Sequence, residues 1–259
     1  MRVTLLGTGD ATGVPAPLCR CEYCTESAPR RRPALLVESE GTTVVLDVGP
    51  DLADQLRRTD THEVDAFFLT HFHRDHADGL LDLLQTLRTG TDAAWNDAGD
   101  AHAFDLYMTG TATDHLRDAF GYFLDLLDPE WNADGMAVGS LDVRPFPVEH
   151  MRPDYETVGF VVTDGESAVA YAPDMEGFVD GPPSVDGGVD LFVCEGSPVV
   201  GVNHGDETDL LPAVAALSAD RTVLVNASEH ARREHTGALE AHAGEVDCEL
   251  GRDFDEHTL

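Results

Sequence analysis

The sequence contains no lysine, so all 16 basic residues are arginine, and they stand against 49 aspartates and glutamates. The formal net charge at pH 7 is −33. A surface this acidic repels polyanions, and we therefore expect neither nucleic acid nor an anionic membrane as a partner. The same charge destabilises the folded chain through self-repulsion.

Salt would remove most of this self-repulsion. At about 1 M salt the Debye length falls to roughly 3 Å, so exposed carboxylates no longer repel one another over distance. An acidic, lysine-free chain resembles the proteins of salt-accumulating archaea. This resemblance implies a halophilic protein of haloarchaeal origin. The alternative is an enzyme that is acidic without being halophilic.

Long apolar runs and linkers are also missing. No segment approaches the roughly 18 to 20 apolar residues of a membrane span. Residues 1–9 resemble a strand entering a glycine turn and lack the order of a signal peptide. We therefore expect a cytoplasmic protein. No Pro- or Ser-rich stretch divides the 259 residues, so one domain over 1–259 is predicted.

Short β-rich and helical segments alternate along the chain, which is typical of an α/β protein. Strands are predicted at 3–7, 34–39, 42–49, 64–70, 141–150, 157–164, 167–174, 189–197 and 221–228. Helices are predicted at 51–58, 75–88, 111–127, 208–219 and 235–245, with Asp75 capping the second of them. The small and acidic residues 89–103 are expected to form a surface loop.

Three of the twelve histidines fall within six residues of the segment "LTHFHRDHADGL". His71 and His73 are two residues apart, so on an extended segment both rings point the same way. Asp75 and His76 follow at the start of a predicted helix. Imidazoles and carboxylates suit Zn, Mn or Fe, and burying so many polar groups without an ion would be costly. These four residues are therefore predicted metal ligands.

The stretch "THFHRDH" resembles the T-H-x-H-x-D-H signature of the metallo-β-lactamase superfamily. The resemblance implies an α/β fold, an αββα sandwich of two mixed β-sheets flanked by helices, with the metal site at one edge. It also implies three further ligands in order: a histidine at a strand end, an aspartate that bridges two metals, and a late histidine. His150 and Asp174 stand at the first two of these places.

Asn226 stands where the resemblance expects the last histidine. An amide oxygen is a neutral and weaker ligand than imidazole for these ions. The second metal would then be weakly held, bound by another group, or missing. His204 and His235 are conceivable substitutes, and the spacing selects neither.

Cys19, Cys21 and Cys24 crowd into "LCRCEYC". Such spacing suits a metal better than a disulfide, and structural zinc sites commonly use three cysteines and a histidine. The loop, an insertion at about 10–32, resembles that of one superfamily branch. This branch contains phosphoribosyl cyclic phosphodiesterases of phosphonate breakdown and B-type proteins of pyrroloquinoline-quinone biosynthesis. The resemblance implies a fourth ligand at Glu229 or, one residue later, His230, and imidazole favours His230.

These resemblances imply a metal-dependent hydrolase, most simply a phosphodiesterase that uses a metal-bound hydroxide on a small cyclic or diester phosphate. Two divalent ions, Zn or Mn, would lower the pKa of a shared water. Asp75 would ligate one ion and orient the nucleophile. His204 would contact the phosphate or protonate the leaving oxygen.

Other functions remain open at this point. They are a hydrolase of thioesters or lactones, a hydrolase with one metal, an iron oxidoreductase of the same fold, and a non-catalytic zinc-containing accessory protein. Asn226 leaves the one-metal alternatives open and is the main support for the accessory protein. A homodimer is common in this branch and is expected only on that ground.

Overall fold

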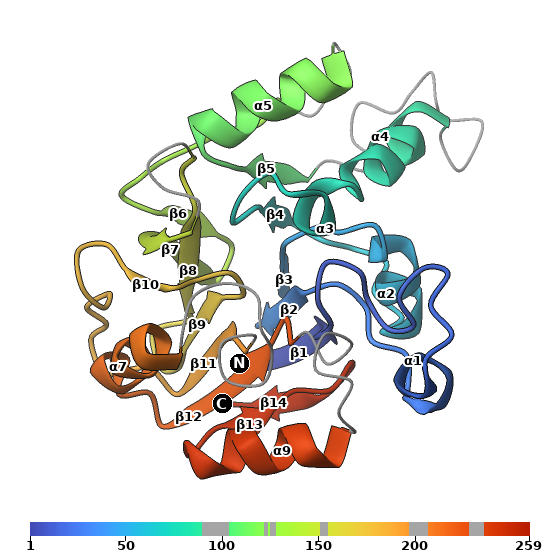
Figure 1. Cartoon of the computed structure of the whole chain (residues 1–259). Coiled ribbons are helices and arrows are strands. Elements are labelled where there is room, and N and C mark those ends of the chain that lie inside the picture. The colour runs from blue at the N-terminus through green and yellow to red at the C-terminus, as the bar shows by residue number, and fades with distance from the viewer. Residues whose placement is uncertain (90–103, 122–123, 125–127, 151–154, 197–206, 228–235) are drawn as a thin grey trace.

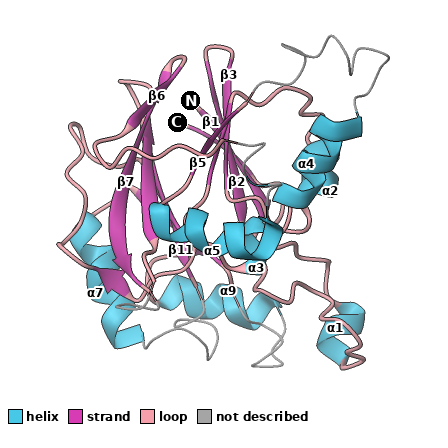
Figure 2. Ribbon diagram, turned by 90° about the horizontal axis from the view of Figure 1, so that it is seen from above, coloured by secondary structure: helices cyan, strands magenta, loops and turns pink. Residues whose placement is uncertain are grey.

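The structure is a computed structural model that describes residues 1–259 except 90–103, 122–123, 125–127, 151–154, 197–206 and 228–235. Two β-sheets lie face to face, and helices cover their outer faces (Figure 2). The predicted αββα arrangement of two mixed sheets is confirmed. Within the described residues, no helix has both the length and the apolar character required to cross a membrane.

The first sheet has the strand order β14-β1-β2-β3-β4-β5. Its strands are β1 (Arg2–Gly7), β2 (Ala34–Ser39), β3 (Thr42–Leu46), β4 (Ala66–Phe68), β5 (Asp105–Tyr107) and β14 (Glu256–Thr258). β1, β2 and β3 are antiparallel, whereas β3, β4 and β5 run parallel. The last strand of the chain pairs with the first, which brings the two termini together.

The second sheet has the order β10-β7-β8-β9-β11-β12-β13, and β6 pairs with β7. Its strands are β6 (Met136–Val138), β7 (Leu141–Glu149), β8 (Val158–Thr163), β9 (Ala168–Ala172), β10 (Gly177–Phe178), β11 (Leu191–Glu195), β12 (Arg221–Val225) and β13 (Glu249–Leu250). β9, β11, β12 and β13 run parallel, so their carboxyl ends share one edge.

The described helices are α1 (Glu22–Glu26), α2 (Leu52–Arg58), α3 (Arg74–Ala77), α4 (Leu80–Thr89), α5 (Gly110–Phe120), α7 (Glu207–Leu217) and α9 (Thr236–Glu245). In Figure 2, α2 and α4 lie outside one sheet and α7 lies outside the other. α3 and α5 lie toward the strand ends that are away from both termini in that view.

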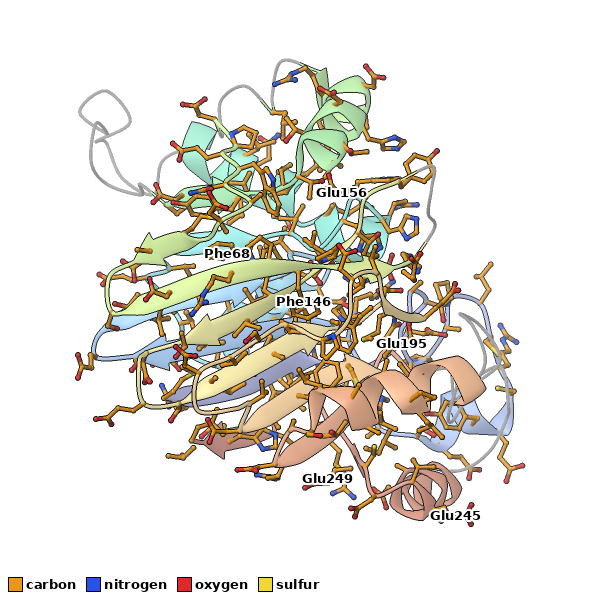
Figure 3. All side chains as sticks on the ribbon, turned by 90° about the vertical axis from the view of Figure 1, so that its left-hand side faces the viewer. Phe68, Phe146, Glu156, Glu195, Glu245 and Glu249 are labelled. Carbon is orange, nitrogen blue, oxygen red and sulfur yellow. The ribbon has the colours of Figure 1, made fainter. Side chains whose placement is uncertain are left out.

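Alternation along the strands builds three apolar layers. Inward side chains such as Val37 and Phe68 of the first sheet and Phe160 of the second form the core between the sheets. Their neighbours along the strands face outward and pack under helices, as Leu36 does beneath α2 to α5 and Phe146 does on the α7 side. Figure 3 labels Phe68 and Phe146 in these separate layers. Successive residues of a strand point to opposite faces of its sheet, and both faces are apolar here because each sheet is covered on both sides.

One predicted helix is wrong in its form: residues 75–88 make two helices, α3 and α4, and Asp75 does not cap them. His73 is the N-cap residue of α3, and Asp75 lies inside its first turn. The break falls at Gly79, whose N–H donates to the carbonyl of Val48 at 2.8 Å instead of continuing the helix. A side chain at Gly79 would meet the backbone of the 48–49 turn, so this close approach of two backbones divides the helix.

The described part of the helix predicted at 111–127 is α5, and residues 122–123 and 125–127 lie outside the described residues. α5 begins at Gly110, where the side chain of Thr109 accepts a hydrogen bond from the N–H of Ala112. It ends at Phe120, because Gly121 takes a positive φ of 62° and turns the chain out of the helix. The predicted loop at 89–103 lies, except for Thr89, outside the described residues.

The cysteine-bearing segment between β1 and β2 forms an excursion that carries α1. In Figures 1 and 2, α1 lies apart from both sheets. An antiparallel bridge between Val14 and Arg30 closes the base of this excursion. The buried Arg30 guanidinium donates to the carbonyls of Thr8 and Gly251, which ties the base to the end of β13.

Candidate metal centre

The histidine motif begins where β4 ends. Asp47, which follows β3, accepts hydrogen bonds from the backbone N–H of Thr70 at 2.9 Å and from its hydroxyl at 3.0 Å. The parallel pairing of β3 and β4 brings these two strand ends side by side. The segment of His71 is therefore held from below by a buried carboxylate, while its side chains extend beyond the sheet edge.

Three imidazoles meet at this edge. Ring centroids lie 4.4 Å apart for His71 and His73, 5.1 Å for His71 and His150, and 5.3 Å for His73 and His150. Each of the three histidines offers one ring nitrogen, and these three nitrogens all lie within 4.8 Å of one another. His150 comes from the end of β7 in the other sheet, so the two sheets together build this group. A set of three nitrogen donors is typical of a catalytic zinc site with an open position.

A second group of donors shares His71. The Nε2 of His76 lies 2.7 Å from Asp174 Oδ2 and 3.2 Å from Asp75 Oδ2. His71, His76 and Asp174 offer donor atoms that all lie within 4.8 Å of one another. Asp174 follows β9, so this group also draws on both sheets. The structure thus brings together five of the predicted ligands, with Asp75 beside them.

The protonation state of His71 fits a metal ligand. Its Nδ1 lies 3.0 Å from the hydroxyl of Thr70, whereas its buried Nε2 has no hydrogen-bond partner among the described residues. Burial, reinforced by the neighbouring His76, lowers the pKa of His71 well below its usual range. The ring is therefore neutral, and a lone pair can face the group, as a divalent cation requires.

His76 is surrounded by carboxylates. Burial alone would lower its pKa, but Asp75, Asp47 and Asp174 outweigh that effect and raise the pKa well above its usual range. His76 in turn lowers the pKa of Asp75, against the raising effect of burial. Three carboxylates around one buried ring stabilise positive charge at this point. A divalent ion between the ring and Asp174 would likewise compensate the negative charge of these carboxylates.

Asp47 is a functional residue that the sequence interpretation missed. It is fully buried, and its Oδ2 lies 2.7 Å from Nδ1 of His76 and accepts from the Tyr171 hydroxyl at 3.1 Å. A carboxylate on Nδ1 leaves Nε2 directed toward the donors, which is the usual support of a histidine ligand. The available signal was an aspartate that ends the buried run "TTVVLD", here with a φ of 65°.

Asn226 lies at the end of β12 and is buried. Its Nδ2 donates to the carbonyl of Pro173 at 3.1 Å and to Glu195 at 3.4 Å. Figure 3 labels Glu195, which ends β11. Nδ2 thus faces two protein acceptors, and of the two polar side-chain atoms only the amide oxygen has the lone pairs that a metal ligand needs. Asn226 is not part of either three-donor group.

The other predicted residues of this corner lie outside the described residues. They are His204, the proposed contact of the phosphate, the substitute ligand His235, and the candidates for the fourth zinc ligand, Glu229 and His230. Their roles stay predictions.

The cysteines form a third group. The sulfur atoms of Cys19, Cys21 and Cys24 lie within 4.8 Å of one another. Burial is the main cause that raises the pKa of Cys24 to about 11, and the other two thiols add to it. Three close thiols therefore resist ionising together unless a cation compensates their charge. This donor set fits a closed thiolate site for zinc, apart from the catalytic group.

Comparison with known families agrees with this geometry. A family model described as a beta-lactamase superfamily domain matches residues 42–231. This range covers well over half of the chain, so the chain belongs to the beta-lactamase superfamily. The match includes both donor groups of the metal centre. The metallo-β-lactamase fold binds divalent metals, and these groups lie where the chain would hold them.

Particular relatives refine the likeness. Ribonuclease Z of Haloferax volcanii is 32% identical over 176 residues, covering 66% of this chain and 46% of that enzyme. The chain thus spans less than half the length of the first curated relatives it matches.

Two solved structures share the fold. Zn(2+)-bound PqqB from Methylobacterium extorquens superposes with a TM-score of 0.76 and 20% identity, covering 100% of both chains. A diphosphatase from the PhnP family gives a TM-score of 0.71 and 22% identity, covering 100% of this chain and 97% of the other. Both match the branch that the cysteine loop resembles, which confirms that expectation.

Proposed function

We propose that this chain is a metal-dependent phosphodiesterase that hydrolyses a small cyclic or diester phosphate. The observation that carries the proposal is the pair of three-donor groups that share His71 and meet Asp174. Adjacent donor groups of this kind suit two ions that act on one phosphate. A diphosphatase and ribonuclease Z, both named for attack on phosphate esters or anhydrides, are among the similar proteins.

The proposed site contains two divalent ions, zinc or manganese, and the cysteine loop contains a structural zinc. When bound, the ion pair would lower the pKa of a coordinated water and stabilise charge on the phosphoryl group. His71, His73 and His150 would hold one ion, Asp75, His76 and Asn226 would hold the other, and Asp174 would complete the set of ligands. Cys19, Cys21, Cys24 and His230, or Glu229, would hold the zinc.

The chain's own groups would then orient the reaction. Asp47 would hold the ring of His76, and Asp75 would bind an ion and orient the attacking water. His204 would contact the phosphate or donate a proton to the leaving oxygen. One P–O bond of the diester would break as water adds, giving a monoester and an alcohol.

The acidic charge sets the expected surroundings. A net charge of −33 opposes polyanions, so we propose a small-molecule phosphate ester as substrate and neither nucleic acid nor a membrane as partner. We also propose that the protein is cytoplasmic, halophilic and a homodimer.

A hydrolase with one catalytic ion is the second candidate. Asn226 favours it, because a neutral amide at the end of β12 supplies less to a second ion than an imidazole would. The amide at Asn226 is equally compatible with an iron oxidoreductase or a non-catalytic accessory protein.

Metal content and turnover together test the proposal. We expect about three metals per chain by element-resolved mass spectrometry of protein purified in high salt, and hydrolysis of bis(p-nitrophenyl) phosphate that His71→Ala abolishes. His62→Ala, a change at an exposed histidine outside the centre, is the matched control. Two metals with turnover would favour the one-ion hydrolase, and an iron signal the oxidoreductase. One zinc without turnover would leave an accessory protein.

A further inference from the structure

Three aromatic rings from three separate segments meet beside the metal centre. Phe72 lies between two of the histidine ligands, and its ring centroid is 5.2 Å from that of His73. His115 of α5 stacks on Phe72, with centroids 3.9 Å apart and planes 33° apart. Tyr155, beyond β7, lies 4.8 Å from Phe72 at 65°. We call these three residues the aromatic group.

Packing of the fold does not account for the outer part of this group. Phe72 contacts the apolar layer beneath α5, but α5 is anchored there by Ala112 and Leu116. His115 itself is exposed, and Tyr155 is half-buried. Among the described residues, neither the ring nitrogens of His115 nor the hydroxyl of Tyr155 makes a hydrogen bond or an ion pair. An exposed ring with free polar edges thus stands one ring away from a metal ligand.

The described charges that flank the aromatic group in sequence are mostly acidic or paired, and they disfavour a second phosphate there. Asp114 and Asp118 flank His115 on α5, and Glu156 follows Tyr155. Glu156 is labelled in Figure 3 just below α5. Two arginines of the described residues lie two positions from a member of the group, and both are paired: Arg117 with Asp114 at 3.5 Å and Arg74 with Asp78 at 2.7 Å. A ligand part that lies on this group should therefore be flat and uncharged, while its phosphate lies at the metals.

We propose that the aromatic group is a stacking site for a nucleobase, so that the substrate is a nucleoside phosphodiester of mononucleotide size. This inference rests on the proposed phosphodiesterase function. Bases stack on aromatic side chains through their π faces, and free nitrogen and hydroxyl groups at the rim can meet their polar edges. A single base with a single phosphodiester satisfies both the rings and the acidic surroundings; a polynucleotide satisfies only the rings.

Two cyclic phosphates that differ in the base provide the test. Adenosine 2′,3′-cyclic phosphate and glycerol 1,2-cyclic phosphate present the same five-membered ring to the metals, and only the first has a base. With metal-loaded protein in high salt, we expect the KM of the adenosine substrate to be roughly tenfold to hundredfold lower. His115→Ala should move the ratio of the two KM values toward one, and His115→Phe should preserve it.

His62→Ala replaces an exposed histidine that belongs neither to the aromatic group nor to the metal centre, and it should leave the ratio unchanged. Equal KM values in the unmodified protein, or a ratio that His115→Ala does not move, would overturn the stacking site. A far lower KM for an oligoribonucleotide than for the mononucleotide would overturn the proposed substrate size.

Absence of turnover of both substrates would contradict the proposed function instead, and binding then tests the stacking site alone. The probes are adenosine 5′-monophosphate and ribose 5-phosphate, titrated into the metal-loaded protein by calorimetry. Tighter binding of the nucleotide that His115→Ala removes supports the site, and equal binding of the two overturns it.

Discussion

Asp47 joins parts of the chain that are distant in sequence. Its carboxylate contacts Thr70, His76 and Tyr171, and the last of these lies 124 residues away. Sequence patterns predicted His71, His73, His76, His150 and Asp174, which the structure brings into two adjacent groups. Those residues follow a recognisable motif or end a predicted strand. Asp47 and Tyr171 acquire their role only when β3, β4 and β9 meet, so no local pattern marks them.

Replacement of Asp47 tests this support directly. We expect Asp47→Asn to weaken metal binding by roughly 10- to 100-fold, because the His76 ring loses the carboxylate that orients it. The measurement is competition with a chelator of known affinity. Asp60→Asn, at an exposed aspartate, is the control and should leave the affinity unchanged. Unaltered affinity in the Asp47 variant would show that the ring needs no such support.

Asn226 would determine how strongly the proposed second ion is held. Asn226→His would place an imidazole at the end of β12, and we expect the last metal to bind at least tenfold more tightly if this residue faces the ion. Stepwise calorimetric titration separates that metal from the others. The control is Asn132→His, at an exposed turn. If neither variant changes the titration, Asn226 lies outside the coordination sphere.

Elements with a long, strong pattern were predictable, and short ones were not. The alternating or continuous apolar runs of β2, β7, β8, β9 and β11 gave strands close to the predicted bounds. β10, β13 and β14 have only two or three residues and exist because neighbouring strands offer them free edges. The division of residues 75–88 into α3 and α4 likewise depends on a backbone from elsewhere, the 48–49 turn.

Gly79 should be indispensable to that division. A Cβ there would lie within 3.0 Å of the carbonyl oxygens of Val48 and Gly49, which are backbone atoms and cannot rotate away. We expect Gly79→Ala to destabilise the fold by about 2 kcal/mol or more, measured by chemical unfolding in high salt. Since α3 carries Asp75 and His76, metal affinity should fall as well.

Gly110→Ala is the matched control, because a Cβ at this first residue of α5 meets nothing within 4 Å. It should change stability little or increase it slightly. Equal stability of the two variants would mean that the turn at 48–49 moves aside easily, and that the helix break has another cause.

On the scale of the whole molecule, the acidic surface charge and the packing of the apolar interior are nearly independent of each other. The arginines at 30–32 are engaged internally: Arg30 is buried, Arg31 pairs with Asp54 and Asp253, and Arg32 pairs with Asp51. They hold the base of the cysteine loop and do little to neutralise the surface. Only 16 arginines stand against 49 acidic residues, so most of the acidic charge has no basic residue to compensate it. The apolar layers set the fold, and the surface sets the conditions in which it is stable.

Stability should therefore rise steeply with salt. The Debye length falls from roughly 30 Å at 0.01 M salt to roughly 3 Å at 1 M, which removes most repulsion between exposed carboxylates. Each kcal/mol regained should raise the Tm by about 2–4 °C for a chain of this size. We expect the Tm, measured by circular dichroism, to climb throughout this range of KCl concentration.

Salt also strengthens apolar burial, so a charge variant must separate the two effects. Neutralising three exposed acidic residues, Glu40→Gln, Glu166→Gln and Asp186→Asn, removes repulsion without touching an apolar layer. If repulsion governs stability, this variant should melt at a higher temperature than the unmodified chain in dilute salt and at nearly the same temperature in concentrated salt. An equal difference at both concentrations would show that salt acts on the interior, and that the acidic surface has little part in the stability of the fold.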